Sequence, residues 1–93
     1  MLHAFVLVSA RPDRVAALCG ELADTEGVTE VFSVTGGLAD IIAIVRVRHH
    51  EDLAGVVTGK IAPMAGIDKT TRLVAFEAYS RHDLEAIWDI GPA

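Results

Sequence analysis

The order of hydrophobic patterns along the chain constrains its fold more than any other feature. Four segments read as β-strands because they are rich in apolar and β-branched residues. These segments are 2–10, 28–35, 38–48 and 67–80. Between them, apolar residues recur at helical spacing, first as Val15, Leu18, Cys19 and Leu22, and later as Leu53, Val56, Val57 and Ile61. The expected order is therefore strand, helix, strand, strand, helix, strand.

The two halves of this order resemble each other, since Glu26-Gly27-Val28 and Ala65-Gly66-Ile67 stand at equivalent places. Such a pattern predicts an α+β fold of the ferredoxin-like, split βαβ type (βαββαβ), a four-stranded antiparallel sheet with its helices on one face. A short C-terminal helix carrying Leu84, Ile87 and Trp88 is expected to follow. The 93 residues fit one domain, 1–93.

The third strand indicates that both faces of the sheet are covered. Its odd positions, from Ala39 to Val47, are all apolar and are expected to face the helices. Its even positions should face away, yet they include Leu38, Ile42 and Ile44. A small chain in which 52% of residues are hydrophobic has little other interior, so we expect a second subunit to cover this face. The alternative is a tolerated apolar patch on a monomer.

Charge and cysteine content exclude several classes of protein. A net charge of −5 argues against direct nucleic-acid binding, which normally needs a basic face. The single cysteine, Cys19, cannot form an internal disulfide and fits a reducing compartment. No signal-like segment and no apolar run of about 18 residues is present, so the expected location is cytoplasmic, without membrane contact.

No pattern of catalytic or metal-binding residues stands out. The sequence has no nucleophile elbow, zinc-protease motif, P-loop or dinucleotide-binding motif. The adjacent His49 and His50 cannot share a face of a helix, which is poor spacing for a metal site. We therefore expect no metal, no cofactor and no catalytic residue.

The segment around Gly36-Gly37 has the composition of a small-ligand site. The glycines predict a tight hairpin turn whose accessible N–H groups could hold a carboxylate. Asp40, just inside the third strand, could bind an ammonium group. The glycine N–H groups and Asp40 together therefore suit the carboxylate and the ammonium group of an amino acid. Alternatively, Asp40 forms an ion pair with a cation on the sheet surface, namely Arg46, Arg48 or Arg72.

A second polar segment precedes the last strand. Thr70 and Thr71 lie between Lys69 and Arg72, and hydroxyl groups that donate and accept suit a zwitterionic ligand. The alternative is structural, because threonines favour strands and cations remain solvated at strand ends.

Taken together, these motifs resemble the effector-binding domain of the Lrp/AsnC feast/famine regulators. Gly27-Val28 followed by VTGGLADIIA at 34–43 resembles the family run G-V-…-T-G-x-x-D-hydrophobic, and AGIDKTT at 65–71 is similar to P-G-V-x-x-T-x-T. The resemblance covers nearly all of the chain. Family regulators usually begin with a DNA-binding helix-turn-helix, which this sequence lacks, so it looks like the stand-alone variety. The family's second threonine falls at Arg72, which leaves open whether Thr70 or Thr71 faces a ligand.

The resemblance implies a dimer formed sheet to sheet, rings of dimers such as octamers, and an amino-acid effector bound between dimers. The implied ligand-binding residues are Thr35, Gly36, Gly37, Leu38, Asp40, Thr70 and Thr71. The leading hypothesis is a small-molecule-sensing oligomer, not an enzyme, that modulates transcription or metabolism through partner proteins. One alternative is an enzyme like the dimeric α/β-barrel monooxygenases, for which only His3 and Tyr79 could serve. Another is a structural partner that co-assembles with full-length Lrp/AsnC regulators.

Overall fold

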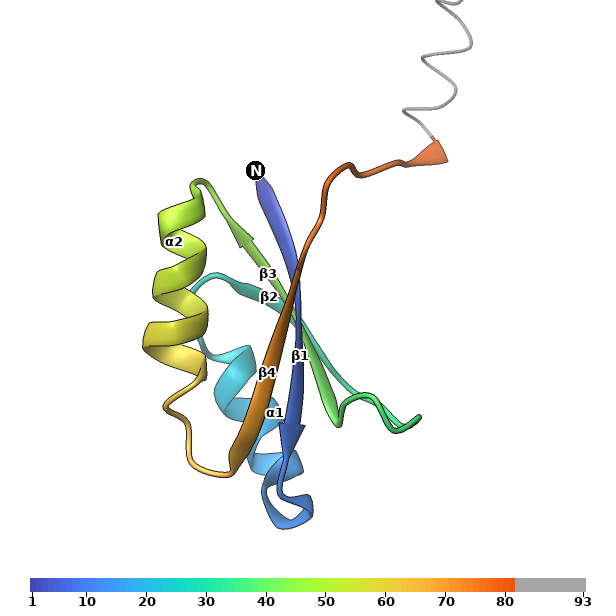
Figure 1. Cartoon of the computed structure of the whole chain (residues 1–93), viewed down its shortest axis with the longest axis vertical. Helices are drawn as coiled ribbons and strands as arrows, with labels where there is room; N and C mark the ends of the chain where they lie inside the picture. Colours follow the sequence, from blue (N-terminus) through green and yellow to red (C-terminus); the bar gives the residue numbers. More distant parts are fainter. Residues whose placement is uncertain (82–93) are drawn as a thin grey trace, which may run out of the picture.

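A computed structural model describes residues 1–81 of the chain. Its elements are β1 (Leu2–Ala10), a 3₁₀ turn η1 (Pro12–Arg14), α1 (Val15–Ala23), β2 (Val28–Ser33), β3 (Ile41–Val47), α2 (His50–Ala54), a π-helix η2 (Gly55–Ile61) that continues α2, and β4 (Ile67–Val74). The strands form one antiparallel sheet in the order β2-β3-β1-β4. Both helices lie on the same side of this sheet (Figure 1). The predicted ferredoxin-like α+β fold is confirmed, and the predicted C-terminal helix lies outside the described residues.

Three predicted strand ends differ from those in the structure. β2 ends at Ser33 and β3 begins only at Ile41, because the intervening loop contains Gly36 and Gly37 with φ of +137° and +91°, outside the range of strands. The predicted tight turn is therefore a loop of residues 34–40. β4 ends at Val74, which lies opposite Ala4 of β1, and only the Ala75 N–H still bonds to β1 before the chain leaves the sheet.

The core lies between the sheet and the helices. In β3 the predicted inward positions Ile41, Ala43, Val45 and Val47 are buried, whereas Ala39 lies in the loop and is only half-buried. The other buried residues come from β1, α1, α2 and η2, and they are Ala4, Val6, Val8, Ala10, Leu18, Leu22, Leu53, Val56, Val57 and Ile61. Cys19 packs half-buried against this core. Among the described residues, no helix is both long and apolar enough to cross a membrane.

The side of the sheet away from the helices carries a continuous apolar surface, which we call the outer face. Its residues are Phe5, Leu7, Phe32, Ile42, Ile44 and Leu73. In the strand register Phe5 lies between Ile44 and Leu73, and Leu7 lies opposite Ile42. Among the residues that the structure describes, no helix covers this side (Figure 1), and Phe5, Phe32 and Leu73 are 40–52% exposed.

The apolar surface continues past the end of β4. The Ala75 N–H donates to the His3 carbonyl at 2.8 Å, and the chain then leaves the sheet on the side away from α2 (Figure 1). This departing segment exposes 96% of Phe76 and 69% of Tyr79.

Two glycines allow the two halves of the fold to pack closely. Gly27 and Gly66 have φ of +96° and +92°, in the left-handed region that favours glycine. A Cβ on Gly66 would lie 2.6 Å from Cγ of Arg14, and one on Gly27 would lie 3.0 Å from Cγ2 of Val56. Arg14 is itself held in place, because its Nε donates to the Ala65 carbonyl at 3.0 Å.

Substitution of Gly66 by Ala is expected to lower the free energy of unfolding by about 1–3 kcal/mol, because both the backbone and the Arg14 contact would be strained. In a domain of this size that is a fall in Tm of roughly 4–8 °C per kcal/mol. Gly20→Ala is the matched control. Gly20 lies inside α1 with open space around it, so Gly20→Ala should stabilise by about 0.5–1 kcal/mol. Urea unfolding measures both changes, and equal stabilities for Gly66→Ala and the parent chain would contradict the packing described.

Candidate ligand-binding site

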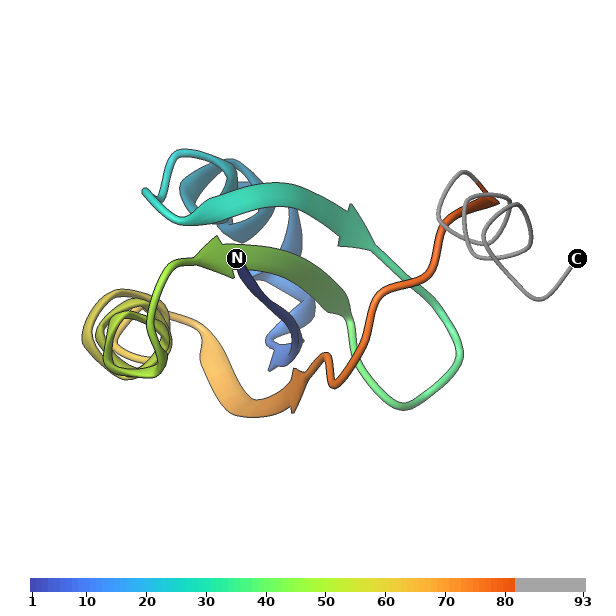
Figure 2. The same cartoon turned by 90° about the horizontal axis from the view of Figure 1, so that it is seen from above.

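The loop of residues 34–40 is anchored at its base to two strands. The Val34 N–H donates to the Asp40 carbonyl at 2.9 Å and closes the loop. The Asp40 N–H in turn donates to the Val8 carbonyl of β1, also at 2.9 Å. Both views place the loop on the side away from α2 (Figures 1 and 2). The loop is therefore a fixed extension of the β2–β3 hairpin at one end of the sheet.

The middle of the loop presents unused backbone donors. Within residues 1–81, no acceptor takes a hydrogen bond from the N–H groups of residues 35–39. Gly36 and Gly37 have open space where a side chain would stand, so their positive φ alone makes them glycine positions. Successive exposed N–H groups in such a turn form a concavity suited to an anion.

A hollow of about 250 Å³ lies between this loop and the outer face. Its walls are largely apolar, formed by Leu7, Val34, Thr35, Gly36, Leu38, Ala39 and Ile42. The volume is below the range of about 300–1,000 Å³ typical for drug-sized ligands, so it suits a compound with few heavy atoms.

The carboxylate of Asp40 has a structural partner that the sequence did not indicate. Its Oδ2 accepts the N–H of Ala10 at 2.8 Å, where the pairing of β1 with β4 shifts register. The other oxygen, Oδ1, has no partner among the described residues. The ion pairs in that part of the chain join Arg11 to Asp13 and Arg14 to Glu21, so the alternative that an arginine pairs with Asp40 was wrong.

The model of the Lrp/AsnC ligand binding domain matches residues 3–84. The chain belongs to the Lrp/AsnC family.

Solved structures agree with this assignment. TTHA0845 from Thermus thermophilus is 44% identical, with a TM-score of 0.82 over 87% of this chain and 100% of that one. Hypothetical protein PHS023 from Pyrococcus horikoshii is 27% identical, with a TM-score of 0.76 over 88% and 98% of the two chains. The regulator NMB0573 from Neisseria meningitidis, solved as an L-Met complex, shares the fold at 17% identity and a TM-score of 0.76, over 85% of this chain and 52% of that one. The comparison with curated proteins gives no match.

The strand register separates the two threonines of this Lrp/AsnC domain. Thr71 lies opposite Leu7, which lines the hollow, and it is exposed on the outer face. Thr70 lies opposite Val8, so it points toward the helix layer and is half-buried. Of the two hydroxyl groups, only that of Thr71 shares a face with the hollow.

The structure brings the other predicted site residues together only in part. Thr35, Gly36 and Leu38 line the hollow, Gly37 lies in the same loop, and Asp40 lies at the base of the loop. Sequence reasoning missed Leu7 as part of the wall and assigned Ile42 only to the outer face. The sequence signal that could have identified Leu7 and Ile42 is their outward position in neighbouring strands. Outward residues that pair next to a loop lie beneath that loop.

The two residues considered for catalysis lie in different elements of the structure. His3 lies opposite Arg46 in the sheet, and Tyr79 lies in the exposed segment after β4, not on the predicted last strand. The Tyr79 hydroxyl donates to the Glu77 carboxylate, and this bond raises the pKa of Tyr79. A raised pKa makes the phenol a weaker acid, the opposite of an activated base. Across residues 1–81, no three potential metal ligands lie close enough to hold an ion.

Proposed function

We propose that this Lrp/AsnC domain senses an amino acid with a small apolar side chain, bound at the hollow beside the loop of residues 34–40. One observation carries the proposal. Free backbone donors, a partly free carboxylate and an apolar hollow lie at the same end of the sheet.

Each group matches one part of an amino acid. The N–H groups of Gly36 and Gly37 suit the carboxylate, because exposed backbone donors bind anions. Oδ1 of Asp40 suits the ammonium group, and the hydrogen bond between the Val34 N–H and the Asp40 carbonyl holds the Asp40 backbone beside Val34, a residue of the wall. Leu7 and Ile42 suit the apolar side chain, which explains why the hollow needs no further polar group.

The same proposal includes self-assembly through the outer face. A second copy would bury the apolar residues of β1, β3 and β4 that the helices leave uncovered, together with the exposed Phe76 beyond them. The loop stands at the end of the sheet, where a neighbouring dimer in a ring, such as an octamer, could close the hollow. Assembly would then depend on the ligand, which is how binding could become a signal.

We infer that the signal passes through other proteins, full-length Lrp/AsnC regulators among them, and not through catalysis or direct contact with DNA. The net charge of −5 supports this, since a duplex repels an acidic protein.

A thermal-shift screen of the twenty amino acids tests the proposal. A ligand present at 100 times its Kd should stabilise the domain by ~2.7 kcal/mol, roughly 10–20 °C in Tm. L-Methionine is tested early, because the Neisseria meningitidis regulator of the same fold was solved as its L-Met complex. For the best ligand, the amine that lacks its carboxylate serves as control and should give no shift. No stabilisation by any amino acid would contradict the proposal.

A further inference from the structure

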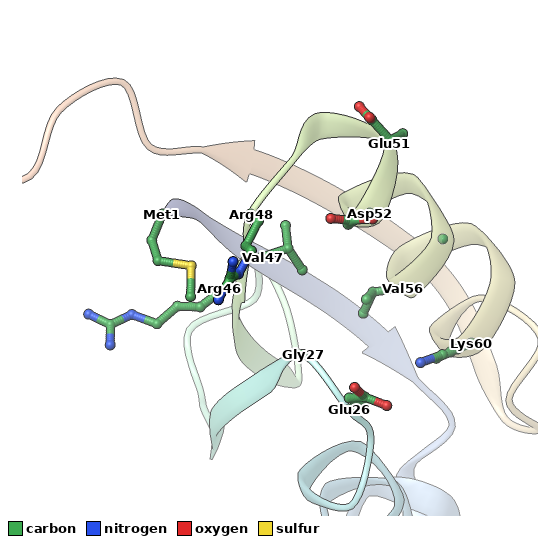
Figure 3. A pocket seen from close by; sticks show the side chains of 11 residues that line it. Met1, Glu26, Gly27, Arg46, Val47, Arg48, Glu51, Asp52, Val56 and Lys60 are labelled. Carbon is green, nitrogen blue, oxygen red and sulfur yellow. The ribbon is translucent and has the colours of Figure 1, made fainter.

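A second, larger hollow lies at the opposite end of the sheet. Its volume is about 600 Å³, and its lining includes Gly55. Its floor contains Gly27, Val47 and Val56 (Figure 3). Val47 is the last residue of β3 and pairs with Leu2 at the start of β1, whereas the loop of residues 34–40 precedes β3. Within β3, Ile42 lines the hollow beside the loop and Arg46 and Val47 line the second one, so the two hollows border opposite ends of this strand.

Charged side chains of both signs surround this second hollow. They are Glu26, Arg46, Arg48, Glu51, Asp52 and Lys60. Figure 3 shows Glu26, Asp52 and Lys60 directed over the apolar floor, while the guanidinium of Arg46 extends away from it. The hollow is thus built for a polar ligand, in contrast to the apolar hollow beside the loop.

Most of these charged side chains have no partner among the residues that the structure describes. Among residues 1–81, the side chains of Glu26, Arg48 and Lys60 make no ion pair or hydrogen bond, and the same holds for Glu51. Asp52 accepts only the backbone N–H of His49, at 3.2 Å. Unpaired charges over a partly apolar floor can bind groups of opposite charge without first breaking a bond inside the protein.

The backbone around this hollow is specialised. Gly27, with φ of +96°, lets its turn approach Val47 and Val56 of the floor. The wall containing Gly55, Val56 and Lys60 is the π-helix η2, where the Ala62 N–H donates to the Val57 carbonyl five residues earlier, at 2.8 Å. π-Helical segments are rare and occur frequently at functional sites.

We propose that the second hollow binds a small metabolite of the basic amino-acid type, with one carboxylate and two cationic groups. Of the charged side chains that Figure 3 shows directed over the floor, Glu26 and Asp52 are carboxylates and Lys60 is a cation, so a ligand with one net positive charge balances them. The ligand carboxylate pairs with Arg48 or Lys60, and its cationic groups pair with Glu26 and Asp52. This site differs in place and polarity from the one proposed beside the loop. The domain would therefore bind two classes of amino acid, apolar ones beside the loop and basic ones in the second hollow.

Titration of the ¹⁵N-labelled protein with L-arginine tests the second site, with glycine amide signals as reporters. Gly27 and Gly55 report on this hollow, and Gly36 and Gly37 report on the loop. L-Arginine should shift the first pair and leave the second pair unchanged. Glu26→Gln should then weaken L-arginine binding about fivefold or more, because a charge-assisted contact is lost.

Asp24→Asn is the matched control, since it removes the same charge from an exposed residue at the end of α1, outside the hollow. It should leave the affinity for L-arginine unchanged. The proposal is overturned if 10 mM L-arginine leaves the signals of Gly27 and Gly55 unshifted, because a site with a Kd of about 1 mM would be mostly occupied at that concentration. Equal affinity of Glu26→Gln and the parent chain, or shifts at Gly36 and Gly37 only, would also overturn it. Failure of the loop site appears separately, as absence of shifts at Gly36 and Gly37 with every apolar amino acid.

Discussion

Replacement of Ile44 by Asp is expected to dissociate the protein into monomers of 9.9 kDa. Ile44 lies on β3 in the middle of the outer face, with Phe5 on one side and Glu30 on the other. If a second copy covers this face, the new carboxylate would be buried without a partner, which costs several kcal/mol. Light scattering at micromolar concentration measures the mass directly.

Two further variants make this result specific. Ile42→Asp places the same charge one pair further along the outer face and should also give monomers. Ala17→Asp places it on an exposed position of α1, in the opposite layer, and should leave the assembly intact. Circular dichroism checks that all three variants keep the fold. A parent chain that is already monomeric at this concentration would contradict the proposed assembly.

Substitution of Asp40 by Asn is expected to weaken binding of the best apolar amino acid roughly 10- to 150-fold. Asn keeps an oxygen that can accept the Ala10 N–H, so the base of the loop should hold. Only the negative charge offered to the ligand ammonium group is removed, and a charge-assisted hydrogen bond contributes about 1.5–3 kcal/mol. Isothermal titration calorimetry compares the two affinities.

Asp40→Ala separates the structural role of this residue from its proposed role in binding. Alanine removes the acceptor as well as the charge, leaving the part-buried Ala10 N–H unpaired, which costs about 1–3 kcal/mol of stability. Asp40→Asn should avoid most of that cost while losing the same ligand contact. If Asp40 serves only to bind Ala10, Asp40→Asn will keep its affinity, and the ammonium contact is then wrong.

Much of the fold follows from the sequence because burial leaves a local pattern. In β3, alternate apolar residues such as Ile41 and Ala43 identify the inward face, since successive side chains of a strand point to opposite sides. In α1, Leu18 and Leu22 recur at helical spacing and are both fully buried. The order of these patterns was enough to predict the four-stranded sheet with both helices on one side.

The ends of the strands and the shape of the site depend on contacts between distant residues. β4 stops pairing with β1 at Val74, opposite Ala4, and only the Ala75 N–H still bonds to His3, which no pattern in 67–80 reveals. From the sequence, the carboxylate of Asp40 was expected to be available to a ligand. In the structure, the N–H of Ala10, thirty positions earlier, donates a hydrogen bond to one of its oxygens.

The sequence alone therefore determined which residues are buried in strands and helices, and which loop carries the glycines and Asp40. Only the tertiary structure decided that Thr71, and not Thr70, shares a face with the hollow, because that depends on pairing with Leu7. It also placed Glu26 and Lys60 around one hollow. Neither residue belongs to a periodic pattern, because periodic patterns arise from burial and charged side chains remain in solvent. The two residues come close only because the turn at Gly27 packs against Val56.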